Sequence, residues 1–119
     1  MIHILICDDD RAFALRLRAA VDALLEERRV SAKITVFSSA EEIGAETLAS
    51  CDAAFLDIDF AGEEQNGLDL ARKIRASRND AVIVFVTNYV EYAPEGYEVR
   101  AFRYLLKEEL PRRLEDCLS

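Results

Sequence analysis

Five short apolar runs, separated by segments with helical spacing, constrain the fold more than any other feature of the chain. Each run has the length and the β-branched or aromatic content of a buried strand. Between the first two runs, Phe13, Leu17 and Val21 recur on one face of a helical pattern. The expected strands are residues 2–7, 32–37, 53–57, 81–87 and 101–107. The expected helices are residues 11–29, a short helix opened by a Ser39–Glu42 capping box, 66–77, a short helix within 88–99, and 110–118.

This alternation predicts a doubly wound parallel sheet, because parallel strands need crossover connections and helices supply them on both faces. The run at 81–87 lacks polar alternation, so it should be an interior strand covered on both faces. Five such strands commonly take the flavodoxin-like order 2-1-3-4-5, with ligands at the carboxyl ends of strands one and three. We therefore expect a single α/β domain over residues 1–119, with five strands and five helices.

Composition narrows the class of protein. The chain is 51% hydrophobic, which is enough for a packed core, yet no apolar run approaches the ~20 residues of a membrane helix. No signal peptide is apparent, so a cytoplasmic location is expected.

The three cysteines, Cys7, Cys51 and Cys117, are odd in number and far apart in the sequence. This favours a role as small buried hydrophobic residues over zinc ligands or disulfides. A net charge of −8 argues against direct nucleic acid binding by this domain and suits cations or basic protein surfaces.

Polar residues collect where the expected strands end. Asp8 and Asp9 follow the first strand, Asp57 ends the third, Thr87 ends the fourth and Lys107 ends the fifth. In the expected order these strands are neighbours, so the acids, the hydroxyl and the ammonium should meet at one edge of the sheet. Any one of them alone would be an ordinary turn, cap or surface residue. Their joint placement is what indicates a functional site.

Clustered carboxylates predict a cation. At a separation of about 4 Å and an effective dielectric constant near 20, each pair of carboxylates repels by roughly 4 kcal/mol. Mg²⁺ would relieve this repulsion, since it prefers oxygen ligands and takes only one or two carboxylates besides water. A carboxylate beside such a metal can attack phosphorus. The metal, Lys107 and the Thr87 hydroxyl would then hold the phosphoryl oxygens as charge moves.

The segments "ILICDDD", "FLDID", "NGLDLARKIR", "IVFVT" and "FRYLLK", in this order, resemble the receiver domain of two-component response regulators. The resemblance covers the whole chain and is strongest to receivers of the LytTR and accessory-gene-regulator type. It implies that Asp57 is the phosphorylated aspartate and a ligand of Mg²⁺. It also implies that Asp8 and Asp9 hold the metal, with Asp9 as the direct ligand, and that the backbone carbonyl of Asp59 completes the protein ligands.

The same resemblance implies a switch and its partners. Thr87 would hydrogen-bond the phosphoryl group, Lys107 would pair with it, and Tyr104 would be the aromatic switch. Without the resemblance, Tyr104 would be interpreted as an edge-strand aromatic. A sensor histidine kinase would be the phosphodonor. Phosphorylation would then shift the surface of the fourth helix, fifth strand and fifth helix, bias homodimerisation and control a downstream, transcriptional output.

The chain departs from the family pattern without losing a reacting group. Ala61 stands where a proline is usual, and Asn88 stands where a small residue usually follows the threonine. Glu108 replaces a common proline after the lysine, and the loop over 58–67 is about two residues longer than usual. These differences bear on loop shape and on the entry and loss of the phosphoryl group.

Two other functions compete with the receiver interpretation, in which the domain is not an enzyme beyond its own phosphotransfer and dephosphorylation. The Asp57-x-Asp59 pair also occurs in haloacid-dehalogenase-type phosphohydrolases. That family places its paired acids after the nucleophile, whereas Asp8 and Asp9 precede it, and this short chain has no cap insert. The second alternative is a pseudo-receiver that only binds partners, which the intact reacting groups disfavour.

Overall fold

A parallel sheet of five strands, in the order β2-β1-β3-β4-β5, forms the centre of the molecule. The computed structural model describes residues 1–39, 42–57, 67–77, 80–87 and 103–107. The order of the strands in this sheet is the order 2-1-3-4-5 that the sequence predicted, so this prediction is confirmed. The strands are β1 (Ile2–Cys7), β2 (Ala32–Phe37), β3 (Ala53–Leu56), β4 (Val82–Thr87) and β5 (Arg103–Leu106).

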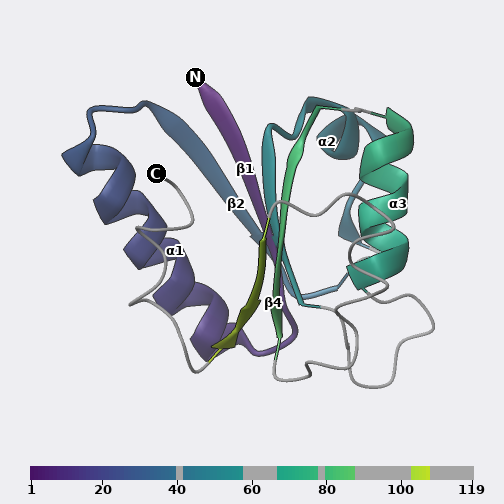
Figure 1. Ribbon diagram of the computed structural model, residues 1–119, viewed down its shortest axis with the longest axis horizontal. Coiled ribbons are helices and arrows are strands. Elements are labelled where there is room, and N and C mark those ends of the chain that lie inside the picture. The colour runs from purple at the N-terminus through teal and green to yellow at the C-terminus, as the bar shows by residue number, and fades with distance from the viewer. Residues whose placement is uncertain (40–41, 58–66, 78–79, 88–102, 108–119) are drawn as a thin grey trace.

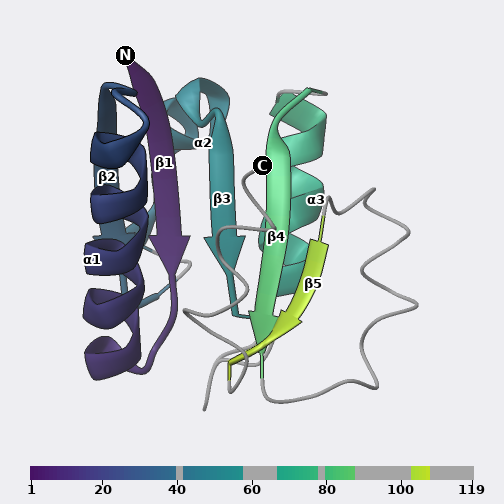
Figure 2. The same ribbon diagram turned by 60° about the vertical axis from the view of Figure 1, so that its left-hand side comes forward.

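Helices cover both faces of this sheet, as the doubly wound prediction requires. Figures 1 and 2 show α1 on one face and α2 with α3 on the other. The predicted helices within 88–99 and at 110–118 lie outside the described residues. Within the described ranges, no helix combines the length and the apolar character needed to cross a lipid bilayer. The helices are α1 (Arg11–Glu27), α2 (Ala45–Ser50) and α3 (Gly67–Ser77).

The core has two halves, because successive residues of a strand point to opposite faces. In β1, Ile4 and Ile6 pack on the α1 side, whereas Leu5 and Cys7 pack on the side of α2 and α3. The same alternation holds in β4, whose four central residues are at most 1% exposed. Burying each large apolar side chain contributes about 1.5–3 kcal/mol. The four central residues of β4 are Ile83, Val84, Phe85 and Val86.

Helix α1 begins as predicted and ends slightly earlier. The Asp10 side chain caps it by accepting the Phe13 N–H at 3.1 Å. The helix ends at Glu27 rather than at residue 29, because Arg29 adopts a left-handed conformation with φ 59°. The Arg29 N–H donates to the Glu26 carbonyl at 3.0 Å, and the next N–H donates to the Leu25 carbonyl at 2.8 Å. This is a Schellman motif with arginine where glycine is usual.

The short helix does not begin at Ser39 and Glu42, where the capping box predicted its start. Helix α2 begins only at Ala45, after Gly44 as N-cap. The Glu42 carboxylate instead accepts the Ser38 hydroxyl at 3.1 Å, and the Glu42 N–H donates to the Ser39 carbonyl at 3.3 Å. The next residue, Ile43, is buried in the core on the α2 and α3 side.

Candidate functional site

The register of β1 and β3 brings two acids together at the carboxyl edge of the sheet. Cys7 of β1 pairs with Leu56 of β3, and the next residue of each strand is an aspartate. The Asp57 N–H donates to the Cys7 carbonyl at 3.0 Å, and the Asp8 N–H donates to the Phe37 carbonyl at 3.1 Å. The backbones of both acids are therefore held by bonds that continue the sheet ladder.

Three charged residues of the site, two of them buried, share one side of the sheet. Residues two positions before each of them belong to the half of the core that packs on α1. Because side chains repeat with a period of two along a strand, each charged residue continues toward the same side. The three pairs are Ile6 with Asp8, Phe55 with Asp57, and Leu105 with Lys107.

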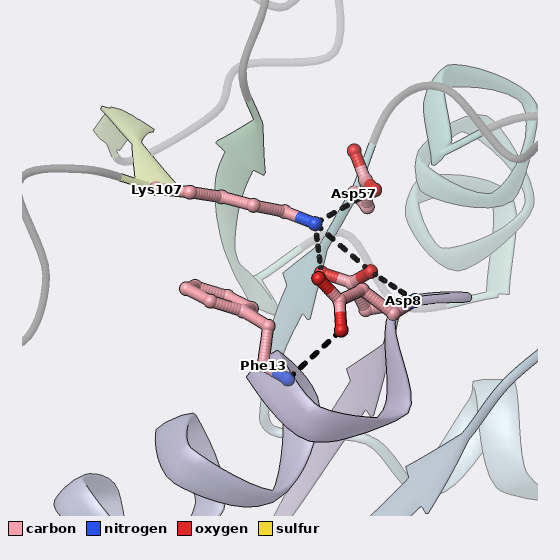
Figure 3. A network of polar contacts seen from close by, with 5 residues as sticks. Asp8, Phe13, Asp57 and Lys107 are labelled. Carbon is pink, nitrogen blue, oxygen red and sulfur yellow. Dashed lines mark hydrogen bonds and ion pairs between the residues drawn. The ribbon is translucent and has the colours of Figure 1, made fainter.

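An ammonium group bridges the two acids. Lys107 Nζ lies 2.9 Å from Asp8 Oδ2, 3.0 Å from Asp8 Oδ1 and 3.2 Å from Asp57 Oδ2 (Figure 3). The Asp10 backbone N–H also donates to Asp8 Oδ1, at 2.9 Å. The side chains of Asp8, Asp57 and Lys107 are only 3%, 7% and 10% exposed. Their charges therefore interact in a site from which most water is excluded.

Burial and ion pairing act in opposite directions on the charged groups. Burial raises the pKa of the Asp8 carboxyl, although hydrogen bonds from Lys107 and from the Asp10 N–H oppose this rise. Burial lowers the pKa of Lys107, but the hydrogen bond to Asp8 and the charges of Asp8 and Asp57 outweigh it. The pKa of Lys107 is therefore raised above its ordinary value of 10.5. The ammonium stays charged at neutral pH.

The acids fit a divalent cation. Asp8, Asp9 and Asp57 each offer a carboxylate oxygen, and these oxygens lie within 4.8 Å of one another. Opposite ligands of Mg²⁺, which binds oxygen at about 2.0–2.1 Å, are about 4 Å apart. Small side-chain rotations would therefore let the oxygens reach one ion. Three carboxylates and one ammonium give the site a net charge of −2, which a divalent cation would balance. Asp9 is exposed, so this side of the site has room for water ligands.

The other predicted site residues are placed only in part. Thr87 is the last residue of β4 and pairs with Leu106, so its backbone lies at the same edge of the sheet, beside the residue that precedes Lys107. Tyr104 lies within β5, where it pairs with Phe85. The side chains of Thr87 and Tyr104 lie outside the described part of the chain, as does Asp59 in full.

The prediction from sequence missed one neighbour of the lysine. The ring centroid of Phe13 lies 4.7 Å from Lys107 Nζ, although its helical spacing indicated only a core residue. Asp10 contributes twice at this edge, because its side chain caps α1 and its backbone N–H donates to Asp8. The sequence did contain a signal for this contact. Phe13 lies in the first turn of α1, and this helix begins at the edge of the sheet that carries the acids.

Comparison with known proteins agrees with this arrangement. Residues 4–119 match the family model of the response regulator receiver domain. The chain is 29% identical over 119 residues to the sensory transduction protein LytT of Bacillus subtilis, covering 100% of this chain and 47% of that protein. It is 34% identical over 119 residues to a response regulatory protein of Yersinia pestis, covering 100% of this chain and 48% of that protein. The chain thus spans about half the length of these curated relatives.

Solved structures give the same result. The response regulatory domain of mrkE from Klebsiella pneumoniae has a TM-score of 0.82 at 26% identity, covering 98% of this chain and 92% of that one. A CheY-like receiver domain protein from Methanospirillum hungatei has a TM-score of 0.76 at 24% identity, covering 99% and 90%, and shares the fold. The chain therefore belongs to the response regulator receiver-domain family of two-component systems, with the LytTR-type regulators LytT and LytR among its relatives.

Proposed function

We propose that residues 1–119 form a single receiver domain in which Asp57 accepts a phosphoryl group from a sensor histidine kinase, with Mg²⁺ as cofactor. One observation carries the proposal. The Lys107 ammonium lies between two buried carboxylates, Asp8 and Asp57, and Asp9 offers a third oxygen within ligand distance. Such a cluster is costly for folding, and a site that binds a cation and an incoming anion gives it a use.

In the proposed reaction, an oxygen of the Asp57 carboxylate attacks the phosphorus of a phosphohistidine. The new O–P bond forms as the P–N bond breaks, and the imidazole nitrogen keeps the electron pair and takes a proton. Bound Mg²⁺ supplies positive charge that neutralises the phosphoryl oxygens. Lys107, already 3.2 Å from Asp57, needs only a small movement to pair with a phosphoryl oxygen. Asp8, Asp9 and Asp57 would hold the metal, and the Asp59 carbonyl would complete the protein ligands.

The proposed output follows from the position of β5. Lys107 directly follows this strand, so its movement toward a phosphoryl group acts on β5 and on its neighbour β4. Thr87 would move toward the phosphoryl group and Tyr104 would turn inward. Such coupling is typically about 1–3 kcal/mol, which suffices to bias a homodimerisation equilibrium. A transcriptional output would come from another part of a longer regulator, in the cytoplasm, without nucleic acid contact by this acidic domain.

The test is intact-mass measurement after incubation with acetyl phosphate. The wild type should gain one phosphoryl group with Mg²⁺ and none with EDTA. Asp57→Asn should gain none. Asp22→Asn, which removes an exposed acid from α1, is the matched control and should behave as wild type. An equal adduct on wild type and Asp57→Asn would show that the assignment of the phosphoacceptor is wrong.

Three further measurements separate the competing functions. Steady release of phosphate that depends on Asp59 would indicate a phosphohydrolase. A chain that takes up no phosphate, yet keeps its partner binding in Asp57→Asn, would be a pseudo-receiver. A phosphoryl group that appears stoichiometrically and is released by hydroxylamine would support the receiver function.

A further inference from the structure

An aromatic ring lies against the ammonium that bridges the two acids. The Phe13 ring centroid is 4.7 Å from Lys107 Nζ, within the distance at which a cation is attracted by the face of a ring (Figure 3). Phe13 is 8% exposed, and its backbone N–H donates to the Asp10 side chain at 3.1 Å. Core packing therefore holds the ring, and the cap of α1 holds the backbone that carries it.

We propose that Phe13 is a positioning residue for phosphoryl transfer, whose ring face holds the Lys107 ammonium beside the Asp57 carboxylate. This inference rests on the proposed role of Asp57. It assigns to Phe13 an electrostatic role beyond filling the core.

The need for such a partner follows from the charges in the site. Lys107 is held by Asp8 through two contacts and by Asp57 through one. A metal bound by Asp8 and Asp57 would draw both carboxylates away from the ammonium. Lysine has a flexible stem, so an ammonium that loses its anionic partners also loses its position. The neutral ring is not a ligand for the metal, unlike the two carboxylates. It therefore still attracts the ammonium after Asp8 and Asp57 have moved toward the metal.

Position matters here because transfer depends on the ammonium being near the phosphoryl oxygens when charge develops on them. An aliphatic side chain at residue 13 would fill the core but would offer the ammonium no favourable electrostatic contact. Arg16, an exposed residue, places its guanidinium 6.0 Å from the same ring and reaches it from the next turn of α1. It supplies a control, since its removal leaves both the ring and Lys107 in place.

The test replaces Phe13, by site-specific incorporation, with phenylalanines that carry one, two or three ring fluorines. Fluorination weakens the negative face of the ring stepwise while nearly preserving its shape. The rate of phosphorylation by acetyl phosphate is measured over a range of donor concentrations at saturating Mg²⁺. We expect the maximal rate to fall with each fluorine, by about tenfold in total, with little change in the half-saturating donor concentration. Arg16→Gln, which retains the ring, should stay near the wild-type rate.

Nuclear magnetic resonance gives a second readout that does not depend on phosphorylation. In the wild type, the ring current of Phe13 should shift the Lys107 ε-methylene protons upfield, and Phe13→Leu should abolish the shift. Equal maximal rates across the fluorinated series, with Asp57 still phosphorylated, would overturn the inference and leave the proposed function intact. A wild type that takes up no phosphate would overturn both. Lys107 protons without an upfield shift would overturn the contact itself.

Discussion

Replacing Asp57 with asparagine should raise the free energy of unfolding when no divalent cation is present. The buried acids outnumber the single ammonium, and Lys107 keeps a complete partner in Asp8 after the change, at 2.9 and 3.0 Å. The variant therefore does not leave an uncompensated buried charge, which is what usually makes the loss of one ion-pair partner destabilising. An asparagine carbonyl at residue 57 can still accept a hydrogen bond from Lys107.

The distances give the size of the effect. At 3.2 Å and an effective dielectric constant near 20, Lys107 attracts the Asp57 carboxylate by about 5 kcal/mol. The Asp8 carboxylate, within 4.8 Å, repels it by about 3.5 kcal/mol, and the exposed Asp9 adds about 1 kcal/mol in a dielectric near that of water. These terms nearly cancel. The desolvation of a buried carboxylate, several kcal/mol for an ion and much less for an amide, then decides the sign. We expect a gain of about 2 kcal/mol.

Thermal unfolding followed by far-ultraviolet circular dichroism, in EDTA and in Mg²⁺, measures this difference. In EDTA the transition temperature of Asp57→Asn should exceed that of the wild type by roughly 8 °C. Mg²⁺ at a hundred times its dissociation constant should stabilise the wild type by about 2.7 kcal/mol and the variant by less, so the gap should close. Asp22→Asn, an exposed change on α1, should stay within about 0.5 kcal/mol of wild type. A variant less stable than wild type in EDTA would refute the charge-imbalance argument.

The other expected results concern the lysine, the two ends of α1 and pH. Lys107→Met should lower the free energy of unfolding in EDTA by about 3 kcal/mol, because Asp8 and Asp57 lose their cation, and Mg²⁺ should restore part of the loss; urea titration measures both. Arg29→Gly should stabilise by about 1 kcal/mol, since glycine adopts the φ of 59° without strain, and an unchanged midpoint would contradict this. Asp10→Ala should cost about 1 kcal/mol through loss of the cap on α1, again by urea titration. The raised pKa of Lys107 means that its stabilising contribution is complete below pH 10.5 and is lost as pH rises through the folded-state pKa, so wild type should lose stability in that alkaline range more steeply than Lys107→Met.

The strands and their convergence could be predicted because buried parallel strands have a simple sequence pattern. The apolar runs at 2–7 and 32–37 have the bounds of β1 and β2. Once the order of the strands was assumed, the polar residues at their carboxyl ends had to share one edge. The ion pairs from Lys107 to Asp8 and Asp57 then required only that the pattern of alternating side chains continue beyond each strand.

The helix boundaries and the neighbour of the lysine depended on tertiary contacts that a local pattern does not contain. Ser39 and Glu42 match a capping box, yet Glu42 accepts the Ser38 hydroxyl, Ile43 is buried in the core, and α2 begins only at Ala45. At the end of α1, Arg29 accepts a conformation that its side chain disfavours, because two Schellman hydrogen bonds stabilise it. Helical spacing placed Phe13 in the core, but only the packing of α1 against the sheet brings its ring to Lys107.

The most direct test of the central claim is to identify the residue that carries the phosphoryl group. Borohydride reduces an aspartyl phosphate to homoserine, which peptide mass spectrometry can localise after treatment of the wild type with acetyl phosphate and Mg²⁺. We predict homoserine at residue 57, and none when EDTA replaces Mg²⁺. Homoserine at Asp8 or Asp9, or at residue 57 irrespective of the metal, would contradict the account.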